Sequence, residues 1–521
     1  MKFKFRLISS SILCIVTLFF SSSNAQDSLL VGKEIRVASG CDPTSMPDIA
    51  TLTNNAFVVC WQDHSLNVLA HMYDENGRSI SGRIQVNSAL NTRHPEPAIA
   101  ALPNGGFIIC WHHYIEEEKR AELYGQRFSP DGTKTADPFL VTPPSQEQLS
   151  PYRCDVVPLA NGDMVVAWQV YDADGWEHGL FAQRFTQDGE RIEDTFQINA
   201  FPHGANETNV CLAPAPDSGF VATWSREWYN YNLQSFNEDV ALQIFDKNGI
   251  TKNDEITINR TRLYTQVTPA VGVLENGDIL AGWHASEGYY NENIWTQLFD
   301  NEGHRTGLSR PLNHSQGINF FPKITTLKNG KLLLSWNYWP DVGGNGVTQR
   351  DLLGRQFDVS GKPCGDEFRI NDISNLGYVH HSHRVSAFGD SGFVVTWQTG
   401  LESIYAKIYT GEPFISMEDS SSLPETYTLL QNTPNPFNEQ TKIVYELSDM
   451  LSAYWVDIVI YNSLGQVVRK FRKDQQKPGR HEVFWNGSDE AGNMVSSGLY
   501  FCQIRVNGTR YHQMNKMMYM K

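Results

Sequence analysis

The nine residues PNGGFIICW (103–111) occur in close variants along the whole chain. They join an Asn-Gly turn signal to an apolar run that ends on a tryptophan, a pattern typical of a tight hairpin leading into a buried strand. Aligned on the tryptophan, the copies are NNAFVVCW, NGGFIICW, NGDMVVAW, DSGFVATW, NGDILAGW, NGKLLLSW and DSGFVVTW. The tryptophans lie 50 to 61 residues apart, a period typical of propellers and solenoids.

Each repeat predicts four strands. The first strand is short, and the second is apolar on both faces, as expected for a strand between neighbouring sheets. The third strand ends in an aromatic residue four positions before a glycine, and the fourth ends ten residues after that glycine. The pairs are Tyr73/Gly77, Phe128/Gly132, Phe185/Gly189, Phe245/Gly249, Phe299/Gly303 and Phe357/Gly361, and the strand ends are Asn87, Thr142, Asn199, Asn259, Asn313 and Asn371.

The seventh repeat has no fourth strand of its own, because the repeat pattern stops after SIYAKIYTG (403–411). Near the other end of the chain, KEIRVAS (33–39) matches the fourth-strand segment DEFRIND (366–372). We therefore expect the N-terminal strand to complete the last sheet and to close a ring without an exposed edge. The prediction is an all-β fold with a seven-bladed β-propeller over residues 30–411, preferred to an open solenoid, which would need no such clasp.

The rest of the chain predicts a linker and a second domain. The segment GEPFISMEDSSSLPETY (411–427) is polar and has no period, so residues 412–428 are interpreted as a linker. Residues 429–521 contain alternating strands with turn signals every 8–12 residues, the pattern of a small immunoglobulin-like β-sandwich.

Four pieces of this second domain carry a family resemblance: PNPFN (434–438), IYNSLGQVV (460–468), WNGSDEAGNMVSSGLYF (485–501) and the basic, apolar terminus KMMYMK. In this order they resemble the C-terminal (Por-type) sorting domain of the type IX secretion system of Bacteroidetes-type bacteria, over about 93 residues. The resemblance implies that the type IX machinery is a partner and that the cargo is released or attached to the cell surface. An accessory immunoglobulin-like module without a sorting role is the alternative.

The first residues, MKFKFRLISSSILCIVTLFFSSSNAQ, have a basic start, a short apolar centre and a small-residue exit. This is the pattern of a secretory signal peptide, which we place at residues 1–25, and no other stretch is apolar enough to span a bilayer. The mature chain is therefore expected to have no transmembrane segment and to be secreted or located on the outer surface of a Gram-negative bacterium.

The charge argues against nucleic acid as a partner. Of the net charge of −16, the signal peptide contributes +3 and residues 429–521 contribute +3, which leaves −22 on residues 26–428. Such a domain would repel phosphate backbones.

Without the signal peptide seven cysteines remain. Cys60 and Cys110 hold equivalent positions in neighbouring repeats, about 10 Å apart if the sheets stack, so we interpret both as small buried apolar side chains. The sequence does not decide whether Cys154 and Cys211 form a disulfide.

The repeat layout also predicts where a ligand would bind. The tight turns form one face, and the varied loops between strands two and three and between repeats form the other, where function concentrates on rigid scaffolds. Aromatic rings beside polar groups suit an extended glycan, with a protein ligand or loops packing against each other as the alternatives. The predicted ligand-binding residues are Trp176, Trp228, Tyr229, Tyr231, Tyr289, Tyr290, Trp339, Tyr152, Arg153, Tyr378, His381 and His383.

Catalytic motifs are weak. GDSG (389–392) aligns with the Asn-Gly turns and is interpreted as a turn, DADG (172–175) is only a fragment of a calcium loop, and the cluster His380, His381 and His383 has no evident partner. We predict no metal site and no cofactor. The alternatives are calcium at DADG and a transition metal or a general base at the histidine cluster.

The predicted function is therefore an extracellular binding module for a polysaccharide or protein. The first alternative is a polysaccharide lyase or glycoside hydrolase that uses the same face, since propellers host both kinds of protein. The second is a structural surface protein without a ligand. The catalytic candidates, none paired by spacing, are Glu96, Asp172, Glu177, Glu227, Tyr152, Arg153 and His383.

Overall fold

The computed structural model of the chain describes nineteen stretches. They are residues 30–41, 46–87, 96–115, 120–143, 150–171, 178–200, 205–230, 235–260, 265–286, 292–313, 317–340, 350–372, 379–399, 403–410, 427–447, 454–462, 467–490, 492–506 and 512–520. These residues form strands and turns and no helix, which confirms the predicted all-β class. No helix that could cross a membrane is found within these stretches. The predicted signal peptide and the DADG segment lie outside them.

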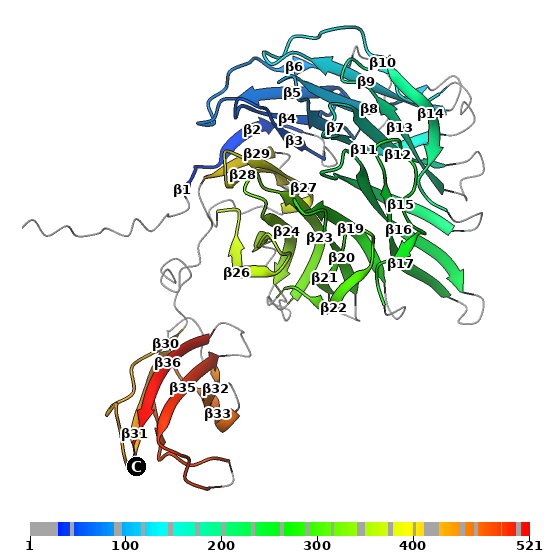
Figure 1. Cartoon of the computed structure of the whole chain (residues 1–521). Coiled ribbons are helices and arrows are strands. Elements are labelled where there is room, and N and C mark those ends of the chain that lie inside the picture. Colours follow the sequence, from blue (N-terminus) through cyan, green and yellow to red (C-terminus); the bar gives the residue numbers. More distant parts are fainter. Residues whose placement is uncertain are drawn as a thin grey trace, which may run out of the picture.

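The described strands up to residue 410 fall into antiparallel groups in chain order (Figure 1). The first group is β3 (Asp48–Thr51), β4 (Phe57–Gln62), β5 (Val68–Tyr73) and β6 (Ile84–Gln85). The second is β7 (Ala98–Ala101), β8 (Phe107–Ile115), β9 (Arg120–Phe128) and β10 (Phe139–Leu140).

The middle groups are linked in pairs. One pair comprises β11 (Ser150–Pro158), β12 (Met164–Tyr171), β13 (His178–Phe185) and β14 (Arg191–Gln197), then β15 (Ala205–Pro214), β16 (Phe220–Asn230), β17 (Ser235–Phe245) and β18 (Ile256–Thr257). The other comprises β19 (Gln266–Val273), β20 (Ile279–Ser286), β21 (Glu292–Phe299) and β22 (Arg305–Pro311), then β23 (Gly317–Thr326), β24 (Leu332–Pro340), β25 (Asp351–Phe357) and β26 (Pro363–Arg369). A single parallel bridge joins β13 to β15, and another joins β21 to β23.

The last group takes strands from both ends of this region. It contains β27 (Val379–Phe388), β28 (Gly392–Thr399) and β29 (Ser403–Thr410), and β29 also pairs with β1 (Leu30–Val31) and β2 (Ile35–Ser39). The predicted pairing of the N-terminal strand with the last repeat is therefore confirmed. The first strands of successive groups lie side by side, and β27 also packs against β3, so that the yellow strands meet the blue ones in Figure 1.

The core lies between neighbouring groups. Each second strand carries one of the repeated tryptophans, and all of them are at most 3% exposed: Trp61, Trp111, Trp168, Trp224, Trp283, Trp336 and Trp397. The cluster that joins the last group to the first contains Val37, Phe388 and Ile404 on one side and Phe57 and Trp61 on the other. The prediction that Cys60 and Cys110 are buried is confirmed, since neither is accessible to solvent.

The residue that ends each fourth strand has one repeated role. Its side-chain oxygen accepts a hydrogen bond from the backbone N–H near the start of the third strand of the same group, at 2.7–3.3 Å. The pairs are Asn87–Val68, Thr142–Leu123, Asn199–Leu180, Asn259–Val240, Asn313–Ile294 and Asn371–Leu352. Such buried N–H groups need a partner, which explains why a polar residue recurs at the same spacing.

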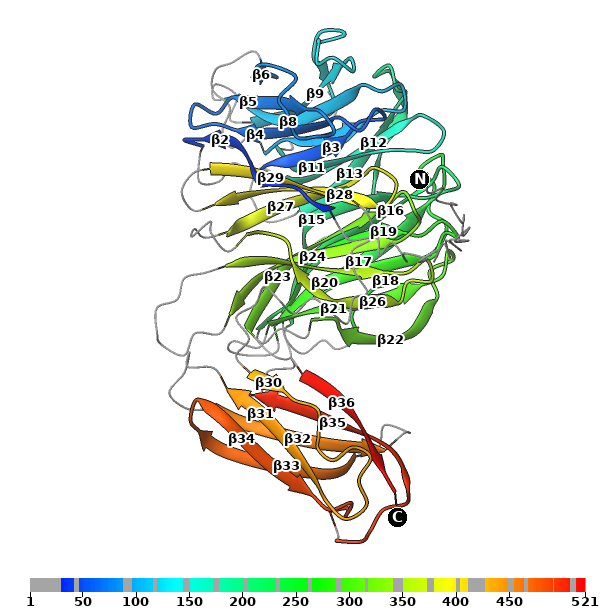
Figure 2. The same cartoon turned by 90° about the vertical axis from the view of Figure 1, so that its left-hand side faces the viewer.

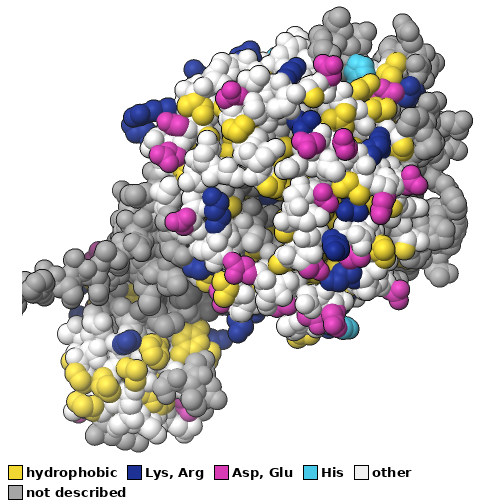
Figure 3. Space-filling model, turned by 45° about the horizontal axis from the view of Figure 1, so that its top comes forward, with side chains coloured by type: hydrophobic (Ala, Val, Ile, Leu, Met, Phe, Trp, Pro, Cys, Tyr) yellow, Lys and Arg dark blue, Asp and Glu magenta, His cyan; other side chains and the backbone are white. Residues whose placement is uncertain are grey.

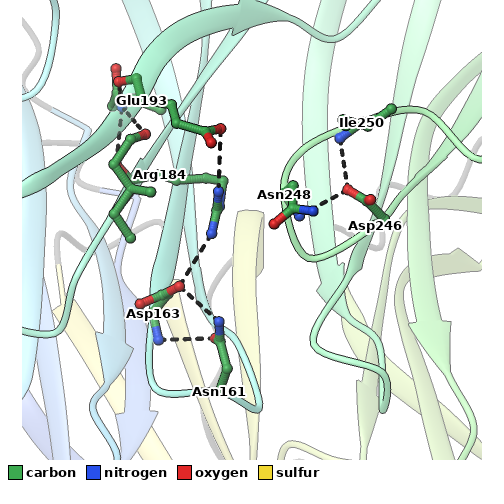
Figure 4. Close-up of polar contacts among 9 residues, drawn as sticks. Asn161, Asp163, Arg184, Glu193, Asp246, Asn248 and Ile250 are labelled. Carbon is green, nitrogen blue, oxygen red and sulfur yellow. Dashed lines mark hydrogen bonds and ion pairs between the residues drawn. The ribbon is translucent and has the colours of Figure 1, made fainter.

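Aspartates fix many of the turns between third and fourth strands. Asp246 accepts hydrogen bonds from the backbone N–H groups of Asn248 (2.8 Å) and Ile250 (2.9 Å), as Figure 4 shows. Gly249 in this turn has φ +79°, and a Cβ there would lie 2.9 Å from Phe196 of the preceding group, so only glycine fits. Figure 4 also shows Arg184 between Asp163 (3.2 Å) and Glu193 (3.6 Å).

Some segments that the sequence suggested as loops are strand extensions. Pairing between β8 and β9 continues to Ile115 and Arg120, and pairing between β16 and β17 continues to Asn230 and Ser235. Polar and aromatic side chains outside the buried core still pair across an antiparallel hairpin, so the apolar run alone underestimates strand length.

The strands after residue 426 form two separate sheets, drawn in orange and red in Figure 2. The first contains β30 (Tyr427–Leu429), β31 (Thr441–Leu447) and β34 (Gly479–Trp485). The second contains β33 (Val467–Gln476), β32 (Tyr454–Asn462), β35 (Gly498–Val506) and β36 (His512–Tyr519).

The PNPFN motif attaches the last strand to this small domain. Phe437 is buried, with its ring 5.4 Å from that of Trp485 and 5.1 Å from that of Tyr519. The Phe437 N–H donates to the Met518 carbonyl (3.0 Å), and the Met518 N–H donates to Asn435 Oδ1 (2.8 Å). The motif therefore covers part of the free edge of β36.

We predict that Asn199→Ala lowers the free energy of unfolding of the large domain by about 1–3 kcal/mol, because it leaves the buried Leu180 N–H without its acceptor. Asn199→Thr should lower the free energy of unfolding by less, since Thr142 accepts the equivalent hydrogen bond in the second group. Urea unfolding followed by tryptophan fluorescence measures both. Equal losses for the two variants would contradict the proposed role.

Candidate functional site

Most of the first strands are bent at one repeated position, fifteen residues before the tryptophan. Non-glycine residues adopt positive φ there: Met46 (37°), Arg153 (43°), Asn209 (58°), Thr268 (50°) and Phe321 (53°). The pairing register of β11, β15, β19 and β23 shifts at the same place. Such bulges re-aim side chains and often lie beside functional sites. We call these positions, together with Tyr152 and with Glu96 in the second repeat, the inner rim.

The inner rim brings together two of the predicted ligand-binding residues, Tyr152 and Arg153, and one catalytic candidate, Glu96. The Tyr152 hydroxyl donates to Glu96 Oε1 (3.0 Å), and Arg153 Nε donates to Glu96 Oε2 (3.0 Å). The Arg153 side chain is 37% exposed and that of Glu96 is 12% exposed. The cluster is therefore half-buried, with the guanidinium reaching solvent.

Hydrogen bonds extend the inner rim across two more groups. Arg153 Nη1 donates to Asn209 Oδ1 (2.6 Å), and Asn209 Nδ2 donates to Ser225 Oγ (3.4 Å). Ser225 Oγ in turn accepts from the Thr268 N–H (2.9 Å), and Gln169 Oε1 accepts from the Asn209 N–H (3.0 Å). These bonds hold the strained backbone of neighbouring strands in one arrangement.

Electrostatics keep the cluster as an ion pair with a neutral phenol. Burial, and next the charge of Glu96, raise the pKa of Tyr152, so its hydroxyl is protonated and donates at neutral pH. Burial alone would lower the pKa of Arg153, but Glu96 and Tyr152 raise it above the ordinary value. The arrangement can offer donors, acceptors and an aromatic face to a polar ligand, while Tyr152 is poorly suited to act as a base.

Two residues further along the first strand, five of the seven repeats carry a charged residue or a cysteine. We call Asp48, Asp155, Cys211, Lys323 and Arg384 the inner ring. Their charges affect one another's pKa values across strands that belong to different groups. Solvent reaches this level, because the Arg384 side chain is 40% exposed. Our sequence reasoning missed the set, although aligning the repeats places all five residues at one position.

The aspartates of the inner ring join neighbouring strands. Asp48 accepts from the N–H groups of Ile49 (2.8 Å) and Ile99 (3.1 Å). Asp155 accepts from those of Val156 (3.0 Å) and Leu212 (2.7 Å). Burial raises the pKa of both carboxyls. The charge of Arg384 and next the bonds from Ile99 and Ile49 oppose this shift at Asp48, and the bond from Leu212 and next the charge of Arg384 oppose it at Asp155. Both side chains therefore fasten the first strand of one group to that of the next.

A buried ion triad supports the fourth group. Arg226 donates to Glu207 (2.8 Å) and also pairs with Glu255, and the three side chains are at most 8% exposed. Because two carboxylates share one guanidinium in a buried place, burial outweighs the attraction of Arg226 and raises the pKa of Glu207 to about 7.

The structure corrects the placement of His383. We expected it in an exposed loop, but it lies inside strand β27 with no exposed surface, and its Nε2 is 2.9 Å from Ser335 Oγ. Burial, and next the charges of Lys323 and Arg384, lower its pKa well below the ordinary value. His383 pairs with Trp397 in the apolar strand β28. The polar residues around His383 gave no sign in the sequence that the strand extends this far.

Two predicted aromatics lie at half-buried positions in long hairpins. Trp228 in β16 donates from Nε1 to Asp239 (3.3 Å), and the guanidinium of Arg350 lies 4.7 Å from the ring centre of Trp339 in β24. The structure does not bring either of them into contact with Tyr152. Trp176, Tyr231, Tyr289, Tyr290 and Tyr378, and the side chains of Tyr229 and His381, lie outside the described residues.

Of the remaining catalytic candidates the structure describes only Glu227. Glu227 accepts from Asn206 Nδ2 (2.8 Å) in the fourth group, away from Glu96 in the second, while Asp172 and Glu177 lie outside the described residues. The GDSG segment is a turn between β27 and β28, as predicted.

The described residues hold no group of three or more potential metal ligands. The seven cysteines from Cys41 to Cys502 are free thiols, including Cys154 and Cys211. In the view of Figure 3, acidic and basic side chains alternate over the surface instead of gathering in one charged patch.

Residues 434–510 match the family model of the FlgD Ig-like domain, so the C-terminal part of the chain is an Ig-like domain. No characterised protein matches the sequence.

Several solved structures are similar in outline. An ulvan lyase of polysaccharide lyase family PL25 is 9% identical, covers 73% of this chain and 96% of its own, and has a TM-score of 0.48. An α-L-arabinanase of Penicillium chrysogenum in complex with arabinobiose is 10% identical, with coverages of 66% and 99% and a TM-score of 0.43. A protein of unknown function from Dyadobacter fermentans is 11% identical, with coverages of 74% and 100% and a TM-score of 0.43. Similarity at this level says nothing about the chemistry of a site.

The raised pKa of Glu207 predicts a pH-dependent stability. Between about pH 4.5 and pH 7 the folded protein binds more protons at Glu207 than the unfolded chain does, so this contribution is present at low pH and is lost as the pH rises. Relative to Glu207→Gln, the free energy of unfolding of the unchanged protein should fall by on the order of 1 kcal/mol or more as the pH rises across this window. Urea unfolding at several pH values measures the loss. The exposed Glu193→Gln serves as control, and parallel pH profiles for all three proteins would refute the assignment.

Proposed function

We propose that residues 30–411 form a closed seven-bladed β-propeller whose inner rim binds an extracellular glycan. The closed ring is supported by the packing of β27 against β3 and by the pairing of β2 with β29. A ring closed in this way holds the first strands, and therefore the inner rim, in a fixed arrangement.

The observation that carries the binding proposal is the half-exposed cluster of Glu96, Tyr152 and Arg153. A sugar presents hydroxyl groups beside apolar ring faces, so it suits an aromatic side chain next to fixed donors and acceptors. Arg153 has donors that reach solvent, and the Tyr152 ring lies 5.6 Å from the guanidinium carbon. Trp228 and Trp339, in the long hairpins, would extend the contact along a chain of sugars.

The engaged state of the carboxylates favours binding over hydrolysis. Glycoside hydrolysis uses two carboxyl groups that flank the bond. Of the described carboxylates near the centre of the ring, Glu96 is held by Tyr152 and Arg153, and Asp48 and Asp155 are held by backbone N–H groups. A lyase or hydrolase that uses the same face is the second candidate, and a protein ligand is the third.

Export and location complete the proposal. The signal peptide would carry the chain across the inner membrane, and the C-terminal domain would act as a type IX sorting domain, which places the propeller outside the cell or on its surface. The order of the PNPFN, IYNSLGQVV and WNGSDEAGNMVSSGLYF motifs supports this role. Within the folded domain, Phe437 and Asn435 of the PNPFN motif bind the backbone of β36, which explains why these residue types occur in the motif.

We expect Arg153→Ala to weaken binding of an oligosaccharide at least about tenfold, because a charged donor is lost from the contact. Tyr152→Phe, which keeps the ring, should weaken it by a smaller factor. Arg127→Ala is the matched control, because Arg127 contacts the turn at Gln187 and Asp188 on the opposite face and should bind normally.

The measurement is a glycan array followed by calorimetry with the oligosaccharides that bind, while reducing ends and unsaturated-sugar absorbance are recorded. Equal affinities for all three variants would refute the inner rim as the site. Release of products by the unchanged protein, lost in Arg153→Ala, would replace the binding function by the enzymatic one.

The export proposal predicts the fate of a reporter. A fluorescent protein placed between residues 1–25 and 429–521 should leave cells that possess type IX secretion. The same fusion without residues 429–521 should stay in the periplasm, and so should both fusions in a strain that lacks the machinery. Fractionation of cells and medium measures this, and retention of the complete fusion would contradict the sorting role.

A further inference from the structure

We propose that the wall of the ring formed by β23, β24 and β27 binds an oxyanion, a carboxylate or sulfate group, between the ammonium of Lys323 and the guanidinium of Arg384. This site lies in the inner ring, separate from the Glu96–Tyr152–Arg153 cluster, and it does not depend on the proposed function.

Lys323 is attracted only weakly by the carboxylates of Asp155 and Asp48, each of which affects its pKa less than Arg384 does. It has no hydrogen-bond or ion-pair partner among the described residues, although it is half-buried at the centre of the ring. Burial, and next the like charge of Arg384, lower its pKa to about 8. A half-buried ammonium with a positive neighbour is costly unless an anion approaches it.

Arg384 is only partly compensated. Its Nε lies 3.6 Å from Asp48 Oδ1, its Nη1 donates to the His383 carbonyl (3.3 Å), and its side chain remains 40% exposed. Asp48 in turn already accepts two backbone hydrogen bonds. The guanidinium therefore has donors left for a further acceptor.

Neither Asp155 nor Asp48 lies within ion-pair distance of Lys323, although the charge of each raises its pKa. Asp155 and Asp48 belong to the third and first groups, where they are bound to N–H groups of the next strand. Lys323 and Arg384 belong to the neighbouring sixth and seventh groups. The inner ring is therefore divided, with its positive charge on one side.

Polar groups beside the two cations complete the site. Lys323 pairs in register with Ser335, whose Oγ lies 2.9 Å from His383 Nε2. His383 Nδ1 is fully buried and has no hydrogen-bond partner among the described residues. The adjacent strands β23 and β27 thus carry an ammonium without a direct partner, a guanidinium with free donors and an unsatisfied imidazole nitrogen.

An oxyanion fits this set better than a neutral group or a cation. A guanidinium and an ammonium side by side repel a cation, and their donors are strongest toward a charged oxygen acceptor. A carboxylate or sulfate group offers two or more oxygens, enough for both side chains. The group could come from a free small anion or from an acidic sugar, and the experiment separates the two.

The test titrates the purified chain with sodium sulfate, sodium acetate, sodium galacturonate and an oligogalacturonate, with ionic strength held constant. Binding is followed by calorimetry and by the shift in melting temperature. Lys323→Met should lower the affinity at least about tenfold, and Arg384→Gln should do the same. Lys252→Met, which removes an exposed lysine paired with Asp217, is the control and should bind normally.

Affinity should also fall as the pH rises through about 8 and beyond, because the anion needs the protonated form of Lys323. Protonation of the other facing groups at low pH would only add positive charge, so the direction does not change. These groups are Arg384 and His383 on β27, Cys211 on β15, Asp155 on β11 and Asp48 on β3.

Binding of sulfate or acetate that requires Lys323 supports the site with a free anion as its ligand. Binding of the oligogalacturonate alone, again requiring Lys323, supports it with an acidic sugar as its ligand. Equal responses of the unchanged protein, Lys323→Met and Lys252→Met to every anion would overturn it. If Lys323→Met does not fold, Arg384→Gln decides in the same way. Loss of neutral-glycan binding in Arg153→Ala would leave this result untouched, so the two proposals fail separately.

Discussion

A strand that is apolar on both faces must be covered on both faces, and most of this structure follows from that constraint. The second strand of every repeat is such a strand, with its tryptophan at most 3% exposed. One sheet can cover only one side of its neighbour, so each group needs another on either side. The first and last groups satisfy this need by packing on each other through Phe57, Trp61 and Ile404. The N-terminal strand then occupies the edge that the last repeat leaves open.

The same constraint brings the first strands together and determines what lies between them. Because the first strands lie close together, Asp48 and Asp155 accept hydrogen bonds from the backbone of the next strand. For the same reason the charge of Arg384 lowers the pKa of Lys323. At the inner rim the strands bend at residues with positive φ, and the bend turns Arg153 toward Glu96. Both candidate sites are therefore consequences of packing the first strands of successive groups side by side, with the chemistry supplied by residues at repeated positions.

Sequence reasoning succeeded where a residue has the same role in every repeat. The tryptophans were visible because seven copies could be compared, and the turn glycines such as Gly249 and the strand-end residues such as Asn199 because six could. It failed where neighbouring repeats differ. Lys323 and Asp155 occupy equivalent positions with opposite charge. Their role could not be predicted from either residue alone, because it depends on the charges that the fold brings near each of them. His383 was misplaced because its polar neighbours concealed a strand that pairing with β28 extends. Tyr152 and Arg153 were named, but their contact with Glu96 spans 56 and 57 residues and depends on the packing of the third group against the second.

A crystal structure of the chain with a bound oligosaccharide tests most directly whether the inner rim is the binding surface. We predict density for sugar residues within hydrogen-bond distance of Arg153 and against the ring of Tyr152, with the Glu96 pair still in place. Density on the turn face or on the C-terminal domain, with Arg153 and Tyr152 in contact with solvent alone, would contradict it.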